Sequence, residues 1–247
     1  MYKRQLLQHL LQPQTQKKRR RLNQKRKNHQ TALIAINRSR KNAGTIGTEN
    51  FIVRIDAGRK KMSKLKVPPN EALYPVPVVL ISCLNQETKK PNIITIAWCG
   101  VVCSKPPLLS VSIRPSRYSY KLIKDTGDFV VNIPSKNLAK KVDLCGIRSG
   151  KDIDKFKEFS LNPIPSSKIH SPMIKECPGN IECILRNVVS LGSHDMFIGE
   201  VVAFHVDEDI TDGNGKIDYN KAGPFVYNHG EYWDLGKQIG YYGFSVK

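Results

Sequence analysis

Four residues in the stretch SIRPSRYS have the types and spacing to bind a phosphate group: Arg114, Ser116, Arg117 and Ser119. They lie at the start of a segment, 116–127, that is predicted to be a helix with Ser116 as its N-cap. A helix N-terminus presents free N–H groups to an anion, and arginine and serine add matching donors. An ordinary capped helix with solvated arginines would use the same residues, so both interpretations stay open here.

A second unusual stretch, NIITIAW, places Asn92, Thr95 and Trp98 on a predicted strand that is otherwise apolar. A purely structural strand needs none of these three side chains. A strand that forms one wall of a pocket for a flat ligand with a polar edge would use them. The competing interpretation is that Trp98 is a core residue, because tryptophan is largely buried in most proteins.

Two single residues are weaker candidates. His194, in the sequence SHD, lies in a short loop between two predicted strands, where functional residues are often found. The three consecutive residues cannot adopt Ser–His–Asp triad geometry, so a solvated turn histidine is the alternative. Lys155, in KDIDKF, is by itself an ordinary exposed helix lysine.

The sequence predicts no metal site. A calcium loop laid over 210–221 would have Lys221 in place of the bidentate carboxylate. The 6 cysteines lack paired zinc spacings, and most are expected to be buried free thiols. Cys99 and Cys103 are predicted to point to the same face of one strand, because they are four residues apart.

The pattern of apolar residues predicts a mainly β fold, a single-domain barrel with helical insertions. A doubly wound parallel sheet is disfavoured because strands and helices do not alternate regularly. The predicted strands are 76–84, 93–103, 108–113, 128–134, 181–191 and 197–206, and the predicted helices are 116–127, 135–150 and 151–159.

Positive charge is concentrated in the first quarter of the chain. Residues 1–61 hold 17 Lys or Arg and 2 Asp or Glu, whereas 62–247 hold 23 and 19. The segment 1–61 is interpreted as a disordered tail, a nucleic-acid arm or a targeting signal, or as no part of the native protein, which would then start at Met62. No secretory signal peptide and no membrane span are recognised, so a cytoplasmic location and no membrane partner are expected.

The stretches NIITIAW, SKPPLLSVSIRPSRYS and GDFVVNIP, in this order, resemble the flavin reductase-like proteins of the FMN-binding split-barrel fold, and most of all the flavoredoxin group. The resemblance spans nearly all of 62–247. It implies a homodimer that binds FMN near the subunit interface, and electron transfer or NAD(P)H-dependent flavin reduction.

The resemblance also implies roles for individual residues. Lys155 and His194 would reach the flavin and are the catalytic candidates, and Tyr227 stands where the flavoredoxin group usually has Phe. A cation at Lys155 would favour the reduced, anionic flavin. The remaining candidates are Asn92, Thr95, Ala97 and Trp98 on the strand beside the isoalloxazine ring, with Asn92 bonding its pyrimidine edge, and Arg117 and Ser119 at the phosphate end. Ser112 is a further cofactor-binding candidate.

Together these observations predict an FMN-binding oxidoreductase. Electrons would come from NAD(P)H or a protein donor and pass through FMN to free flavin, ferric iron or a partner protein. Two alternatives remain at this stage. One is a nucleic-acid-binding protein that acts through residues 1–61, and the other is a flavin-binding module without turnover of its own.

Overall fold

The computed structural model describes residues 64–212 and 216–246. The predictions made for residues 1–61 and for Met62 as a start therefore lie outside the described residues. Residues 64–70 belong to a separate unit of the chain and contain no helix or strand. The fold described below is that of the second unit, Glu71–Lys247.

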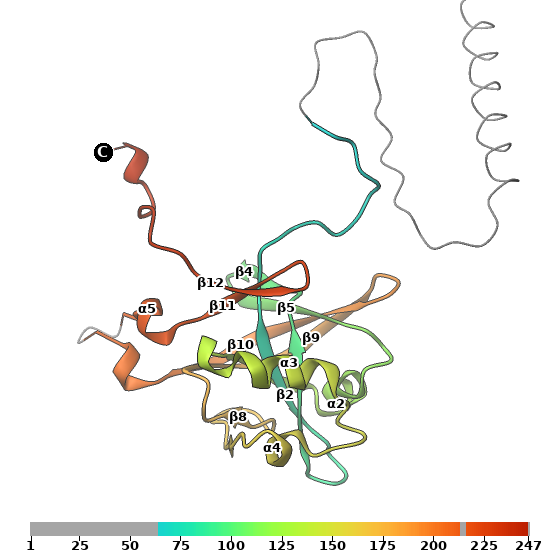
Figure 1. The fold of residues 1–247 in the computed structure, drawn as a ribbon. Helices are drawn as coiled ribbons and strands as arrows, with labels where there is room; N and C mark the ends of the chain where they lie inside the picture. The colour runs from blue at the N-terminus through green and yellow to red at the C-terminus, as the bar shows by residue number, and fades with distance from the viewer. Residues whose placement is uncertain (1–63, 213–215, 247) are drawn as a thin grey trace, which may run out of the picture. The chain divides into compact units, whose positions relative to one another are not determined.

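A seven-stranded antiparallel sheet in the order β3-β2-β6-β9-β10-β5-β4 makes up most of this unit (Figure 1). The longest pair is the β9–β10 hairpin, which places His194 in its connecting loop. The strands are β2 (Val79–Leu84), β3 (Pro91–Ile96), β4 (Cys99–Ser104), β5 (Pro107–Ile113), β6 (Asp128–Ile133), β9 (Gly179–Ser190) and β10 (Asp195–Val206).

A three-stranded sheet, β1-β11-β12, is the second layer, and its strands are β1 (Val76–Pro77), β11 (Phe225–Asn228) and β12 (Glu231–Asp234). Two short strands, β7 (Pro163–Ile164) and β8 (Met173–Ile174), pair with each other. The helices are α2 (Tyr118–Thr126), α3 (Ala139–Ile147), α4 (Lys155–Glu158) and α5 (Tyr219–Ala222), with short 3-10 turns at Lys136–Leu138, Glu208–Ile210 and Phe244–Val246.

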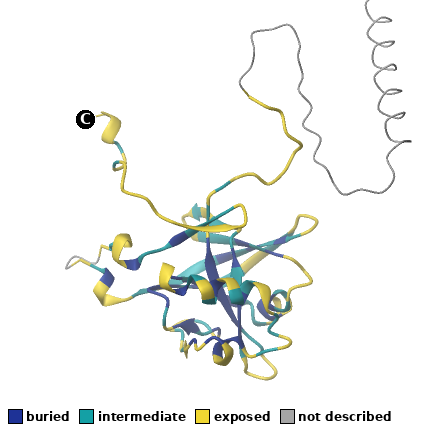
Figure 2. Cartoon of the chain, in the orientation of Figure 1, coloured by how far each residue is buried: buried dark blue, intermediate teal, exposed yellow. Residues whose placement is uncertain are grey.

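Strands β2 and β3 are covered on both faces, which explains why their sequences are apolar runs without alternation. One face packs into a core with Ile123 of α2 and Phe129 and Phe197 of the sheet. The other face packs against Val142 of α3 and Phe156 of α4. Figure 2 shows the result, with the buried residues along the central strands and the outer sides of the helices exposed.

The mainly β fold with helical insertions is as predicted, but details differ. The predicted helix 135–150 is a 3-10 turn followed by α3, which ends at Ile147, and the predicted helix 151–159 is only the short α4. Strands β7, β8, β11 and β12 and helix α5 were not predicted. The predicted strand 93–103 is two strands, β3 and β4, because the chain leaves the sheet at Ala97 and Trp98. A bulge between Val101 and Cys103 in β4 also changes the alternation, so that Cys99 pairs with Val111 and Cys103 with Leu108. The prediction that Cys99 and Cys103 share a face is therefore wrong: Cys99 packs against the core, whereas Cys103 is partly exposed.

Helix α2 ends at Gly127, as predicted, where φ of 71° favours glycine. Its start differs from the prediction, since Arg117 and not Ser116 is the N-cap, and no side chain caps the helix. The first N–H groups of α2 are therefore left without a side-chain acceptor.

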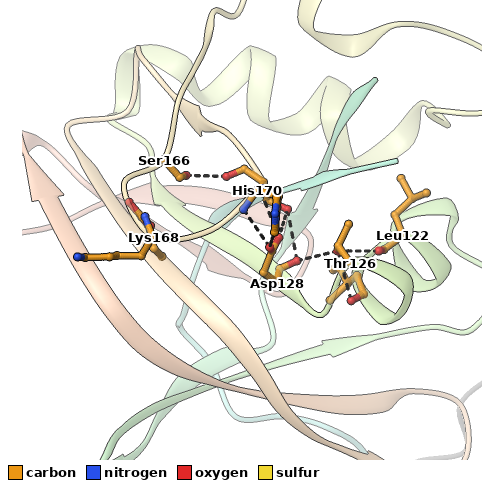
Figure 3. Close-up of polar contacts among 9 residues, drawn as sticks. Leu122, Thr126, Asp128, Ser166, Lys168 and His170 are labelled. Atoms are coloured by element: carbon orange, nitrogen blue, oxygen red, sulfur yellow. Dashed lines mark hydrogen bonds and ion pairs between the residues drawn. The ribbon is translucent and has the colours of Figure 1, made fainter. Parts of the chain in front are cut away.

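A loop of residues 165–172, called the strap here, connects β7 and β8 and is fixed by two buried carboxylates. Figure 3 shows one of them, Asp128, beside His170 of the strap. Asp128 accepts hydrogen bonds from the main-chain N–H groups of His170 and Ser171 at 3.0 and 3.2 Å. Glu182, which is fully buried, accepts from the main-chain N–H groups of Ser167 and Lys168, both at 2.7 Å. The strap is thus attached to the sheet through its main chain, and the side chains of Ser167, His170 and Ser171 contact the same carboxylates.

Across the described ranges, no helix has the length and apolar character needed to cross a membrane.

Candidate functional site

The break between β3 and β4 places Trp98 at the surface of the sheet instead of in its core. The main-chain carbonyl of Trp98 accepts a hydrogen bond from Ser112 N at 2.9 Å, which fixes the break against β5. The indole remains 37% exposed, and its ring centre lies 4.5 Å from that of His194. The interpretation of Trp98 as a core residue is therefore not supported, and the ring is available to a ligand.

Trp98 and His194 are part of the wall of a cleft of about 320 Å³. The cleft lies between the end of β3, the β5–α2 connection, the β9–β10 loop and strand β11. It is lined by most of the predicted site residues, Thr95, Ala97, Trp98, Ser112, Arg117, His194 and Tyr227, together with Glu71, Tyr74, Ile94, Ile96, Ile113, Arg114 and Gly146.

The surroundings of His194 favour the neutral form of its imidazole. Burial lowers the pKa of His194 below its usual 6.5, and the positive charges of Arg114 and Arg117 lower it further. Its Nδ1 atom lies 2.9 Å from Ser193 Oγ. Because Nδ1 has this partner, Nε2 is the ring atom that remains to exchange a proton with a bound molecule.

Tyr227 belongs to an aromatic group on the small sheet. Pairing of β1 with β11 sets Tyr227 opposite Val76, and the ring of Tyr74 lies 6.1 Å from that of Tyr227. The ring of Tyr232 lies 5.9 Å from Tyr227 on its other flank. These contacts hold Tyr227 as an aromatic wall of the cleft.

A second cavity, of about 430 Å³, adjoins the cleft, and the two share Ile94, Arg114, Arg117 and Gly146. It contains the other candidates, Asn92, Ser119 and Lys155, so the structure brings every predicted site residue to one of two adjoining cavities. Their roles stay predictions. The remaining lining residues are Ser116, Tyr118, Arg148, Ser149, Gly150 and Lys151.

Hydrogen bonds within the protein limit what two of the strand residues can do. The buried amide of Asn92 donates to Ser119 Oγ at 2.7 Å, at the opposite end of β3 from Trp98. Asn92 therefore lies among the phosphate candidates, and its expected contact with the pyrimidine edge of a ring beside Trp98 is not supported by this placement. The hydroxyl of Thr95 donates to the carbonyl of Val142, so Thr95 attaches α3 to β3.

Lys155 is buried, with 4% of its surface exposed, which sequence reasoning did not anticipate. Its ammonium donates to the main-chain carbonyls of Ile93 and Cys145, each at 2.7 Å, and so joins α4 to β3 and to the end of α3. Burial lowers the pKa of Lys155 to about 8, and the charge of Arg117 adds to this effect. The observed bonds show a structural role for Lys155 beside its predicted catalytic one.

Sequence reasoning missed Arg148, Gly150 and Lys151, which form a turn after α3. A Cβ at Gly150 would lie 1.9 Å from Asn92 Oδ1, so only glycine allows the turn to approach β3 this closely. The sequence RSGK, at the junction of the predicted helices 135–150 and 151–159, was the available signal, but the packing of α3 against β3 is needed to bring these residues to the cavity.

Comparison with known proteins places this site within a matched region. The family model described as "Flavin reductase like domain" matches residues 72–236. The chain is 32% identical to the flavoredoxin of Desulfovibrio vulgaris (Miyazaki F), covering 74% of this chain and 100% of that one with a TM-score of 0.70. For the flavoredoxin of Methanosarcina acetivorans the identity is 31%, the coverage 75% and 98%, and the TM-score 0.69.

A curated relative from Archaeoglobus fulgidus, described as an uncharacterized protein, is 38% identical over 149 residues, or 60% of this chain and 82% of that one. The alignments with the two flavoredoxin structures cover nearly the whole of those chains and about three quarters of this one. The likeness therefore concerns the domain that contains the cleft and the second cavity.

Proposed function

Because this chain belongs to the family of flavin reductase-like domains, we propose that it is an FMN-binding oxidoreductase with a split-barrel fold of the flavoredoxin type. One observation carries the proposal: the cleft that contains Trp98, His194 and Tyr227 shares Arg114 and Arg117 of its wall with an adjoining cavity lined by cations. A flat, amphipathic ring linked to a phosphate needs this combination of surfaces.

The residues present fit a flavin mononucleotide. The exposed indole of Trp98 and the ring of Tyr227 offer apolar surface for an isoalloxazine. Arg117 occupies the N-cap position of α2, and no side chain accepts a hydrogen bond from the first N–H groups of the helix. These N–H groups and the Arg117 guanidinium can donate to a phosphate. FMN, when bound, would supply the ability to accept and release electrons.

The protein's own residues bind, orient and exchange protons. His194 can accept a proton at Nε2, because its lowered pKa favours the neutral imidazole. Lys155 positions the wall between β3 and α3 through its two carbonyl contacts. Its charge also lies beside the cavity, where it favours an anionic ligand.

The proposed donor is NAD(P)H or a redox protein, and the proposed acceptor is free flavin, ferric iron or a partner protein. The name of one structural relative includes "NADH:FAD oxidoreductase", but at 15% identity that likeness concerns the fold alone. We also propose a homodimer. The exposed apolar side chains of Val101 and Val102, on edge strand β4, are consistent with a protein contact there.

The test is the absorption spectrum of the purified full chain, followed by identification of the compound released on heating. A yellow protein that releases FMN in near-equal ratio, and that oxidises NADH or NADPH when an acceptor is added, would agree with the proposal. A colourless protein that does not change the fluorescence of added FMN would refute it. If the protein is yellow but passes no electrons to an acceptor from NADH, NADPH or a chemical reductant, only the flavin-binding part of the proposal remains.

A further inference from the structure

The cavity that adjoins the cleft has more positive charge than one phosphate needs. Five cationic side chains line it, and no aspartate or glutamate does: Arg114, Arg117, Arg148, Lys151 and Lys155. Like charges that share a cavity repel each other, so the arrangement is unfavourable unless an anion occupies it. A phosphate monoester at pH 7 carries a charge of about −1.5 to −2, which two cations can balance.

The charges of four of these residues are not balanced within the protein. Among the described residues, no ion pair or side-chain hydrogen bond involves Arg114, Arg117, Arg148 or Lys151. Their charged ends are therefore available to a ligand.

Lys155 has a different role from the other cations. It donates to the carbonyl of Cys145, near the C-terminal end of α3, where the helix dipole is negative. The buried ammonium offsets this negative end, which would otherwise repel an anion bound next to the turn that follows α3. Lys155 thus makes the end of α3 compatible with a phosphate.

The donors come from two separate elements. One is the N-terminus of α2 with Arg117, which the proposed function assigns to the phosphate of FMN. The other is the turn of residues 148–151, which Gly150 holds against Asn92. The Lys151 N–H donates to Ser149 Oγ at 3.2 Å, and Asp152 N–H to the Ser149 carbonyl at 3.2 Å. The turn is therefore a fixed part of the wall.

We propose that the turn 148–151 is a second phosphate subsite, in which Arg148 and Lys151 bind the second phosphate of a pyrophosphate-linked ligand. The inference rests on the proposed function, because the first subsite is filled by the flavin's own phosphate. The pyrophosphate can belong to FAD, whose second phosphate directly follows the first. It can also belong to a pyridine dinucleotide bound beside FMN.

The experiment compares the wild-type full chain with the double variant Arg148→Gln/Lys151→Gln. The matched control is Lys140→Gln/Lys175→Gln, which removes two exposed cations that line neither cavity. Riboflavin, FMN and FAD are titrated separately by flavin fluorescence. NADH is titrated by calorimetry into protein saturated with FMN. All titrations are made at one fixed, low salt concentration, because phosphate contacts are screened by salt.

The double variant is expected to lose about tenfold in affinity for FAD, as the loss of charge-assisted contacts at an exposed site implies. Its affinities for riboflavin and FMN should change by less than about threefold, and the control should match the wild type. If NADH binding to the FMN-loaded variant falls and FAD binding does not, the subsite stands and its ligand is the pyridine dinucleotide.

Equal losses for FMN and FAD would overturn the inference, because the turn would then contact the flavin's first phosphate. Unchanged FAD and NADH binding would also overturn it, and would make Arg148 and Lys151 solvated surface cations. If riboflavin, FMN and FAD all fail to bind the wild type, the proposed function fails first. Flavin binding without a selective loss in the variant refutes the subsite alone.

Discussion

Replacing Arg117 by alanine tests the assignment of the phosphate end. Arg117 is the N-cap of α2, lines both cavities and is exposed, with no ion-pair partner in the described part of the chain. A hydrogen bond to a charged group contributes about 1.5–3 kcal/mol, and exposure reduces this to about 1–2 kcal/mol. The variant should therefore bind FMN about 5- to 30-fold more weakly. Riboflavin, which has no phosphate, should bind unchanged.

The same substitution has a second, independent consequence. Arg117 is one of the charges that lower the pKa of His194, after the larger effect of burial. Without Arg117 the pKa of His194 should rise toward its usual value, because the imidazolium is no longer repelled. NMR titration of the imidazole resonances of the ligand-free protein measures this change, with the His194→Ala variant to assign the signal.

Lys124→Ala is the matched control, since it removes a cation from the same helix at its other end. Equal weakening of FMN and riboflavin would show that Arg117 supports the cleft as a whole, and would refute the phosphate assignment. An unchanged His194 titration would show that the Arg117 charge is not oriented toward the cleft.

Four further substitutions test other parts of the structure. Lys155→Met removes a group whose folded pKa of about 8 lies below the unfolded value of 10.5. Between pH 8 and 10.5 the unfolding free energy of the wild type should therefore rise relative to that of the variant, by up to about 1.4 kcal/mol per pH unit, as measured by urea titrations. Gly150→Ala should destabilise by about 1–3 kcal/mol through the clash with Asn92, whereas Gly100→Ala, in open space, should not, and equal melting temperatures would contradict this. Glu182→Gln should lower the unfolding free energy by about 1–3 kcal/mol at pH 7. Because the folded pKa of Glu182 is below its usual 4.5, this stability difference should be full above pH 4.5 and disappear as pH falls through the folded pKa. A difference that does not change with pH would exclude a role for the charge. His194→Ala should slow flavin reduction by about 100-fold in stopped-flow measurements while circular dichroism stays unchanged, and an unaltered rate would remove His194 from the proton-transfer role.

The fold class follows from the sequence because most of its elements have strong local signals. Helix α2 ends at Gly127 because the left-handed conformation there favours glycine, and β2 is an apolar run because both of its faces are covered. The flavin reductase-like resemblance likewise depended on the order of local motifs, and the family match agrees with it.

The features that were missed depend on distant contacts. The strand breaks at Ala97 and Trp98 because β3 pairs with β2 at one edge of the sheet, while β4 pairs with β5 at the other. No glycine or proline stands at the break to reveal it. The burial of Lys155 depends on two carbonyls from other elements. The β11–β12 hairpin, which was not predicted, did have a local signal in His229-Gly230, where both residues have positive φ.

The strap differs from most loops in how its conformation is specified. Asp128 and Glu182 bind its main-chain N–H groups, which every residue except proline has, and the side chains of Lys168 and His170 are exposed. The conformation is therefore specified mainly by two buried carboxylates of the sheet, to which the side chains of Ser167, His170 and Ser171 add contacts. Position 168, whose side chain is exposed and lies outside these contacts, should tolerate nearly any non-proline residue, which makes it a suitable place to attach a fluorophore or an affinity label without disturbing the cleft.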